Sequence, residues 1–66
     1  MNYLHVLKDK FITQAAIAKA IGISQPAVNA WFKKKARPTP ENAILIEHVT
    51  NGEVTRDKVR QDIKWH

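Results

Sequence analysis

An all-α fold of five short helices is predicted by three features of the sequence. Apolar residues recur at three- and four-residue spacing through most of the chain, which is the period of a helix with one buried face. Ser, Thr or Asn precedes these segments as a potential N-cap, and proline occupies the first turn of two of them. Both glycines stand where a helix is expected to end. We therefore expect one compact helical domain over residues 1–66.

Size and composition limit the classes of function. A chain of 66 residues buries only about 60% of its unfolded surface, which leaves no room for a deep catalytic cleft. The sequence has no cysteine, so disulfides, thiolate catalysis and thiolate zinc sites are excluded. No apolar run is long enough to cross a membrane, and the N-terminus has no pattern of a secretion signal. We expect a protein that is neither an enzyme nor associated with a membrane.

The N-terminal segment 2–11 is predicted to form the first helix, with Asn2 as its N-cap. Its apolar residues recur at helical spacing, so this helix should lie across the next two. The expected core contacts are Tyr3, Leu4, Val6, Leu7 and Phe11.

The chain is organised around residues 13–32, which have the pattern of two helices joined by a tight turn. Thr13 is the expected N-cap of the first helix, and Gln14 is its first residue. Gly22 stands where this helix must stop, because a left-handed conformation costs glycine least. The apolar positions that should form the shared inward face are Ala15, Ala18, Ile21, Ile23, Val28 and Trp31. This arrangement is a helix-turn-helix.

The second helix of the motif is predicted over residues 25–33. Ser24 can cap it, and Pro26 lies in the first turn, where its missing N–H is no loss. The outward positions are Gln25, Pro26, Asn29, Ala30 and Lys33. Glutamine and asparagine can each form paired hydrogen bonds with adenine in the major groove of DNA, and an apolar side chain can contact a thymine methyl group. We expect these five residues to contact bases, with the glutamine and the asparagine as the leading candidates.

The net charge of +5 is concentrated in the first 37 residues. These hold seven Lys or Arg and one Asp, whereas residues 38–66 hold four Lys or Arg and five Asp or Glu. A positive field of this kind attracts a polyanion. Helix N-termini and unpaired cations are typical phosphate contacts, and the candidates are Thr13, Gln14, Ser24, Lys34, Lys35 and Arg37. The expected partner is double-stranded DNA.

A fourth helix is predicted from Pro40 to about Thr50, with Thr39 as its cap. Its expected core contacts are Ala43, Ile44, Ile46 and Val49. Leu45 either completes this face or faces a partner, and an exposed Leu45 would mark a dimer patch.

Two interpretations of the following segment stay open. In the helical one, Gly52 is the left-handed terminator of the fourth helix and Thr55 caps a last helix that runs through Arg60. The alternative is an α+β fold with a C-terminal β-hairpin around Asn51-Gly52, because Asn-Gly between β-branched residues is a strong hairpin signal.

The helix-turn-helix resembles that of phage Cro-type repressors. The residues that carry the resemblance are Gln14, Ala18, Gly22, Ile23 and Val28. It implies a lambda-repressor-like domain whose residues 25–33 enter the major groove of a two-fold symmetric operator and block transcription. Two copies would occupy half-sites about 34 Å apart, as a weak or DNA-assisted homodimer. Such a regulator would act in the cytoplasm of a bacterial host, associated with the nucleoid.

The C-terminal segment 50–65 is similar to the tail of the small YdaS/Cro-like regulators of prophages. The matching residues are Val54, Thr55, Arg56, Arg60, Asp62, Ile63 and Trp65. Asn51 replaces the first of two glycines in that pattern, and Gln61 replaces a proline. The apolar residues expected to fold back over the first and fourth helices are Val59, Ile63 and Trp65.

No cofactor, metal or small-molecule ligand is expected. His5, His48 and His66 are far apart in the sequence and lack further ligands at metal-binding spacing. The alternative to a repressor is an antitoxin-like or other protein-interaction regulator, in which Leu45 and Trp65 contact a protein partner and DNA binding is secondary.

Overall fold

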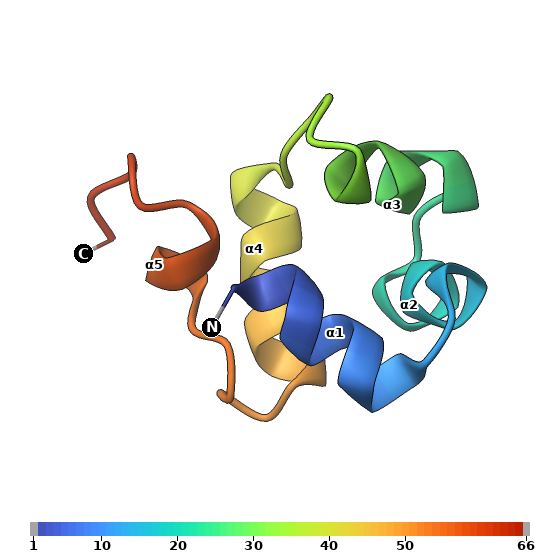
Figure 1. The fold of residues 1–66 in the computed structure, drawn as a ribbon. Coiled ribbons are helices and arrows are strands. Elements are labelled where there is room, and N and C mark those ends of the chain that lie inside the picture. Colours follow the sequence, from blue (N-terminus) through green and yellow to red (C-terminus); the bar gives the residue numbers. More distant parts are fainter. Residues whose placement is uncertain (1, 66) are drawn as a thin grey trace.

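Five helices and no strand lie between residues 2 and 65, the part of the chain that the computed structural model describes (Figure 1). The helices are α1 (Tyr3–Phe11), α2 (Gln14–Ile21), α3 (Gln25–Phe32), α4 (Pro40–Val49) and α5 (Arg56–Val59). The predicted all-α fold is confirmed, and the alternative hairpin around Asn51 and Gly52 does not form. Met1 and His66 lie outside the described residues, so the structure does not test the expectation that His66 binds no metal.

Polar side chains cap four of the five helices, as predicted. The side-chain oxygens of Asn2, Thr13, Ser24 and Thr39 each accept a hydrogen bond from a backbone N–H in the first turn of α1, α2, α3 and α4, at 2.7, 3.1, 3.4 and 3.2 Å respectively. These bonds satisfy N–H groups that have no partner within the helix. Thr55 precedes α5, but its hydroxyl makes no such bond.

Three helices end in a residue with left-handed backbone conformation. Gly22, Lys34 and Asn51 have φ angles of 88°, 60° and 54° after α2, α3 and α4. In each case the next backbone N–H donates to the carbonyl five residues earlier, at 3.0, 2.9 and 2.8 Å. This pattern closes a helix by satisfying a free carbonyl. Gly52 follows with a φ of 79°, so the first left-handed residue after α4 is Asn51 and not the predicted Gly52.

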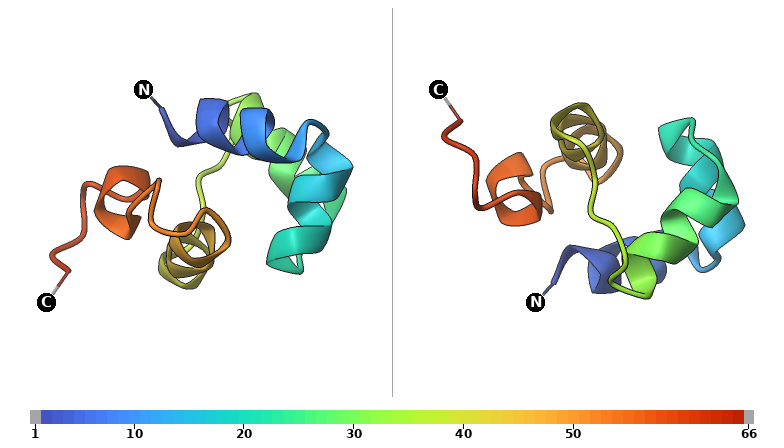
Figure 2. Two further views of the ribbon diagram at one scale, coloured as in Figure 1. Left: turned by 90° about the horizontal axis from the view of Figure 1, so that it is seen from below. Right: turned by 90° about the horizontal axis from the view of Figure 1, so that it is seen from above.

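The helices α1 and α4 lie in the middle of the molecule, with α2 and α3 on one side and α5 on the other (Figures 1 and 2). The core between them is formed by Leu4, Val6, Leu7, Ile17, Ala18, Ile21, Val28, Trp31, Ala43, Ile46, Val54 and Val59. None of the helices described between residues 2 and 65 has the length and apolar character needed to span a membrane.

Two core predictions are wrong. Ala15 is exposed on α2, and Ile17 takes the inward position with none of its surface accessible. The alanines of α2 make its inward face hard to assign from sequence, because they fit both inside and outside. Ile44 of α4 is 38% exposed and Leu45 is 39% exposed, so only Ala43 and Ile46 are buried on this helix.

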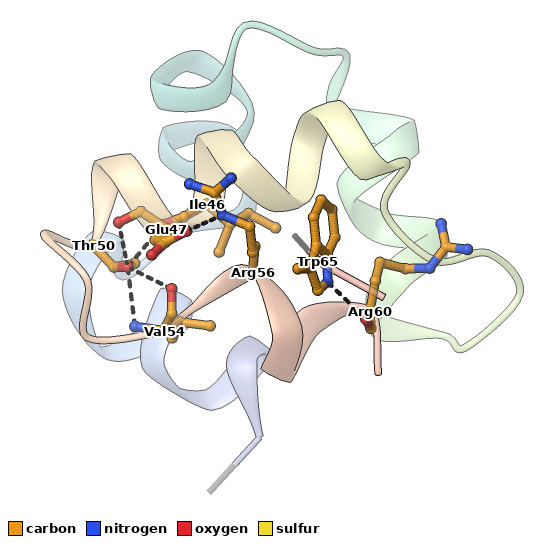
Figure 3. A network of polar contacts seen from close by, with 7 residues as sticks. All are labelled: Ile46, Glu47, Thr50, Val54, Arg56, Arg60 and Trp65. Atoms are coloured by element: carbon orange, nitrogen blue, oxygen red, sulfur yellow. Dashed lines mark hydrogen bonds and ion pairs between the residues drawn. The ribbon is translucent and has the colours of Figure 1, made fainter. Parts of the chain in front are cut away.

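The chain after α4 is held by side-chain hydrogen bonds and an aromatic contact (Figure 3). The Arg56 guanidinium donates to Glu47 on α4 at 2.6 Å and lies 5.7 Å from the ring centre of Trp65. The Trp65 indole N–H donates to the Arg60 carbonyl at 3.1 Å. Val59 is buried, and Trp65 packs half-buried against the core. The tail therefore folds back onto the helical body.

Candidate nucleic-acid interface

The predicted base-contact residues share the outer face of α3, opposite the buried Val28 and Trp31. These residues are Gln25, Pro26, Asn29 and Ala30 of α3 and Lys33, which is the C-cap of the helix. Gln25, Pro26 and Lys33 are exposed, and Asn29 and Ala30 are half-buried. The α3 helix therefore presents polar and small side chains outward and places Trp31 in the core, as predicted.

Asn29 is connected to α2 by a hydrogen bond that the sequence did not predict. Its side-chain N–H donates to the Gln14 side-chain oxygen at 3.2 Å. The Asn29 amide keeps one N–H donor and its oxygen, which are the two groups required for a paired bond to adenine. The Gln14 amide keeps both of its N–H donors. The bond thus joins a candidate base contact to a candidate phosphate contact and orients both.

The N-terminus of α2 lies beside a cation, Lys8, that was not among the predicted phosphate contacts. Thr13 and Gln14 line a small cavity of about 60 Å³ together with Lys8 from α1. Free N–H groups at a helix N-terminus favour an anion, and a neighbouring ammonium group adds to this preference. The signal in the sequence is the short connection between α1 and α2, which forces the end of one helix against the start of the next.

Lys34, Lys35 and Arg37 follow α3 and are all exposed. Arg37 is paired, because its guanidinium lies 3.6 Å from the Asp62 carboxylate of the tail. Both side chains of this pair are largely accessible to water, so a phosphate can compete for the arginine. The sequence alone did not indicate this contact, since the two residues are 25 positions apart.

Comparison with known proteins identifies the family. A family model described as "Bacterial toxin YdaS" matches residues 9–66. The chain belongs to the YdaS family. It is 40% identical over 52 residues to the Escherichia coli K12 protein described as "Putative transcriptional regulator YdaS". This match covers 79% of the chain and 53% of the relative, so the chain spans about half the length of that protein.

A solved structure resembles the whole chain of this YdaS family member. It is the Cro protein from a prophage element of Xylella fastidiosa strain Ann-1, described as "putative prophage element Xfaso 1". The two structures superimpose with a TM-score of 0.83 at 32% sequence identity, and the match covers all of both chains. The resemblances to Cro-type and YdaS-like proteins noted in the sequence are confirmed.

Proposed function

We propose that the chain is a Cro-like DNA-binding transcriptional regulator that inserts α3 into the major groove. Support comes from the descriptions of its relatives as a transcriptional regulator and as a Cro protein. The observation that carries the proposal is the outer face of α3, where Asn29 is oriented by Gln14 and still has both groups needed to recognise adenine.

In this proposal the five outward residues of α3 read bases. The amides of Gln25 and Asn29 pair with adenine, Pro26 or Ala30 contacts a thymine methyl group, and Lys33 reaches a guanine edge.

The phosphate contacts surround this helix. Thr13, Gln14 and Ser24 act from helix N-termini, and Lys34, Lys35 and Arg37 act from the loop after α3. Lys8 joins them, because it lines the same cavity as Thr13 and Gln14. These contacts hold the protein on the duplex and carry no sequence information of their own.

We further propose repression through a two-fold symmetric operator. Two copies would bind half-sites about 34 Å apart and exclude RNA polymerase sterically. No cofactor or small-molecule ligand is required for this mode of action.

The test is a binding titration on the DNA next to this gene and on a scrambled duplex, each at two salt concentrations. Wild type should prefer its own DNA by about 10³-fold, the low end for specific regulators. Asn29→Ala should lose most of this preference. Lys35→Ala should weaken binding to both duplexes alike and reduce the salt slope by about one.

Lys19→Ala provides a control, because Lys19 is exposed on α2 outside the proposed interface. The proposal fails if wild type binds both duplexes equally, or if Asn29→Ala retains the full preference.

A second candidate function is toxicity toward a bacterial cell, which the description of the family favours. Induced expression in a bacterium, with growth as the readout, distinguishes the two. Growth arrest that persists in Asn29→Ala, after sequence preference is lost, would favour an action separate from operator binding. Arrest that disappears together with the preference would favour regulation of a promoter.

A further inference from the structure

A groove beside the loop after α3 is lined by Lys and Arg side chains from both halves of the chain. It has a volume of about 950 Å³. We call it the basic groove, and its walls are formed by Asn2, Tyr3, Leu4, Trp31, Lys34, Lys35, Ala36, Arg37, Lys58 and Gln61. In Figure 2 the start of α1 and the end of α3 lie next to the loop that leads to α4, and α5 lies across from this loop beside α4.

The charged side chains that line this groove are all positive. Four of its lining residues are Lys or Arg, and none is Asp or Glu. The C-terminal half carries a net charge of −1, yet the residues it contributes to the wall are Lys58 and Gln61. The carboxylate nearest to these cations in the hydrogen-bond and ion-pair network is Asp62, which contacts Arg37 and is held by two hydrogen bonds from Arg60. The groove therefore favours an anion.

Neutral donors complete the wall. The Asn2 side-chain oxygen caps α1, which leaves its two N–H groups free to donate. Burial raises the pKa of the Tyr3 phenol, so its hydroxyl stays protonated and can also donate. Asn, Gln and Tyr side chains, together with Lys and Arg, are the residue types that commonly contact the phosphates of DNA.

The groove adjoins the proposed DNA-reading helix, and hydrogen bonds hold the loop between them. Its loop begins directly after Lys33, the C-cap of α3. The Lys35 backbone N–H donates to the Ala30 carbonyl at 2.9 Å, and the Arg60 guanidinium donates to the Pro38 carbonyl at 3.0 Å. Hydrogen bonds therefore hold the loop backbone at both ends and keep its cations close to α3.

We propose that the basic groove holds the DNA backbone next to the bases read by α3, with Lys58 of α5 as a phosphate contact. This inference rests on the proposed function and extends the interface to the C-terminal part of the chain. A DNA backbone fits better than an acidic peptide or a free nucleotide, because the loop cations continue directly from the helix that would lie in the major groove.

The test compares Lys58→Gln with Lys64→Gln. Lys64 is exposed, lies six residues further along the chain and does not line the groove, so both variants lose one charge from the same region. Lys58→Gln should reduce the salt slope by about 0.9, and affinity at 0.1 M salt should fall roughly five- to tenfold on every sequence. The preference for the specific duplex should be unchanged.

Lys64→Gln should retain the wild-type salt slope on both duplexes. Equal losses in the two variants would overturn the proposal, because the effect would then reflect net charge alone. Calorimetry with ATP as a probe tests whether the groove binds a free nucleotide instead. Micromolar binding of ATP that Lys58→Gln abolishes would also overturn the proposal of a DNA-backbone contact. Failure of the proposed function is distinguishable, since wild type would then show no preference for its own DNA.

Discussion

Thr50 is the residue on which the turn after α4 depends. It is 1% exposed, and its hydroxyl donates to the Ile46 carbonyl at 2.8 Å while accepting from the Val54 N–H at 3.2 Å (Figure 3). One small side chain thus closes the helix and starts the following segment. A buried hydroxyl is stable here only because both of its hydrogen-bonding functions are satisfied.

Replacing Thr50 by valine should therefore destabilise the protein by about 1–3 kcal/mol, because the buried Val54 N–H loses its acceptor. Urea unfolding followed by tryptophan fluorescence measures this cost. Thr55→Val is the matched control, since the Thr55 hydroxyl makes no cap bond and its loss should cost little. Equal stability of Thr50→Val and wild type would show that the hydroxyl is dispensable.

Substitution of Gly22 measures the cost of the left-handed turn separately from any steric clash. A methyl group added at this position would meet no heavy atom within 4 Å, so Gly22→Ala introduces no clash. Its expected cost of about 1 kcal/mol comes from the φ of 88° alone. Lys34→Gly should instead stabilise the protein, because glycine adopts the φ of 60° at this position with less strain than lysine. Thermal unfolding of both variants checks this, and a Gly22→Ala protein as stable as wild type would contradict it.

At the scale of elements, the tail determines where the loop after α3 lies. Arg60 donates to the Pro38 carbonyl and makes two hydrogen bonds to Asp62, at 2.9 and 2.8 Å. Asp62 also contacts Arg37. The C-terminal segment thus positions a loop that is more than 20 residues away in sequence.

The stability of this tail contact should depend on pH. The Arg60 hydrogen bond lowers the pKa of Asp62 to about 2 from its usual 3.8. Because the folded pKa is the lower one, the contribution is complete above pH 4 and is lost as pH falls toward 2. Melting temperatures between pH 2 and 5 should show this decline, and Asp62→Asn should make it shallower. An identical decline in Asp62→Asn would assign the pH dependence to other carboxylates.

At the scale of the whole molecule, the protein has little apolar surface left for a strong dimer. Among the described residues, the exposed large apolar side chains are Ile12, Ile44 and Leu45, and Ile12 is far from the other two in sequence. Stable interfaces bury about 800 Å² on each partner. Two neighbouring side chains on α4, each less than half exposed, supply only a small part of that area.

We therefore expect the free protein to be a monomer or weak dimer, with pairing on operator DNA. Sedimentation velocity from nanomolar to high micromolar concentration, with and without the duplex, measures this. Dimers should form at low concentration only when the duplex carries two half-sites. A tight dimer at nanomolar concentration without DNA would contradict the prediction.

Much of this structure follows from local sequence. The caps Asn2, Thr13, Ser24 and Thr39 start their helices as predicted, because capping involves only atoms within a few residues of one another. The same holds for the turn at Gly22. The choice between helix and hairpin after α4 was open in the sequence, and burial of Thr50 and Val54 against the core decided it.

Local sequence patterns were enough to predict the first four helices and their order, the helix-turn-helix and the outward face of α3. Three features became visible once the helices were packed: the inward position of Ile17 in place of Ala15, the bond between Gln14 and Asn29, and the basic groove completed by Lys58. The physical reason is the range of the forces involved. Caps and periodicity act within one or two turns, whereas these contacts join residues on different helices and exist only once the helices have packed.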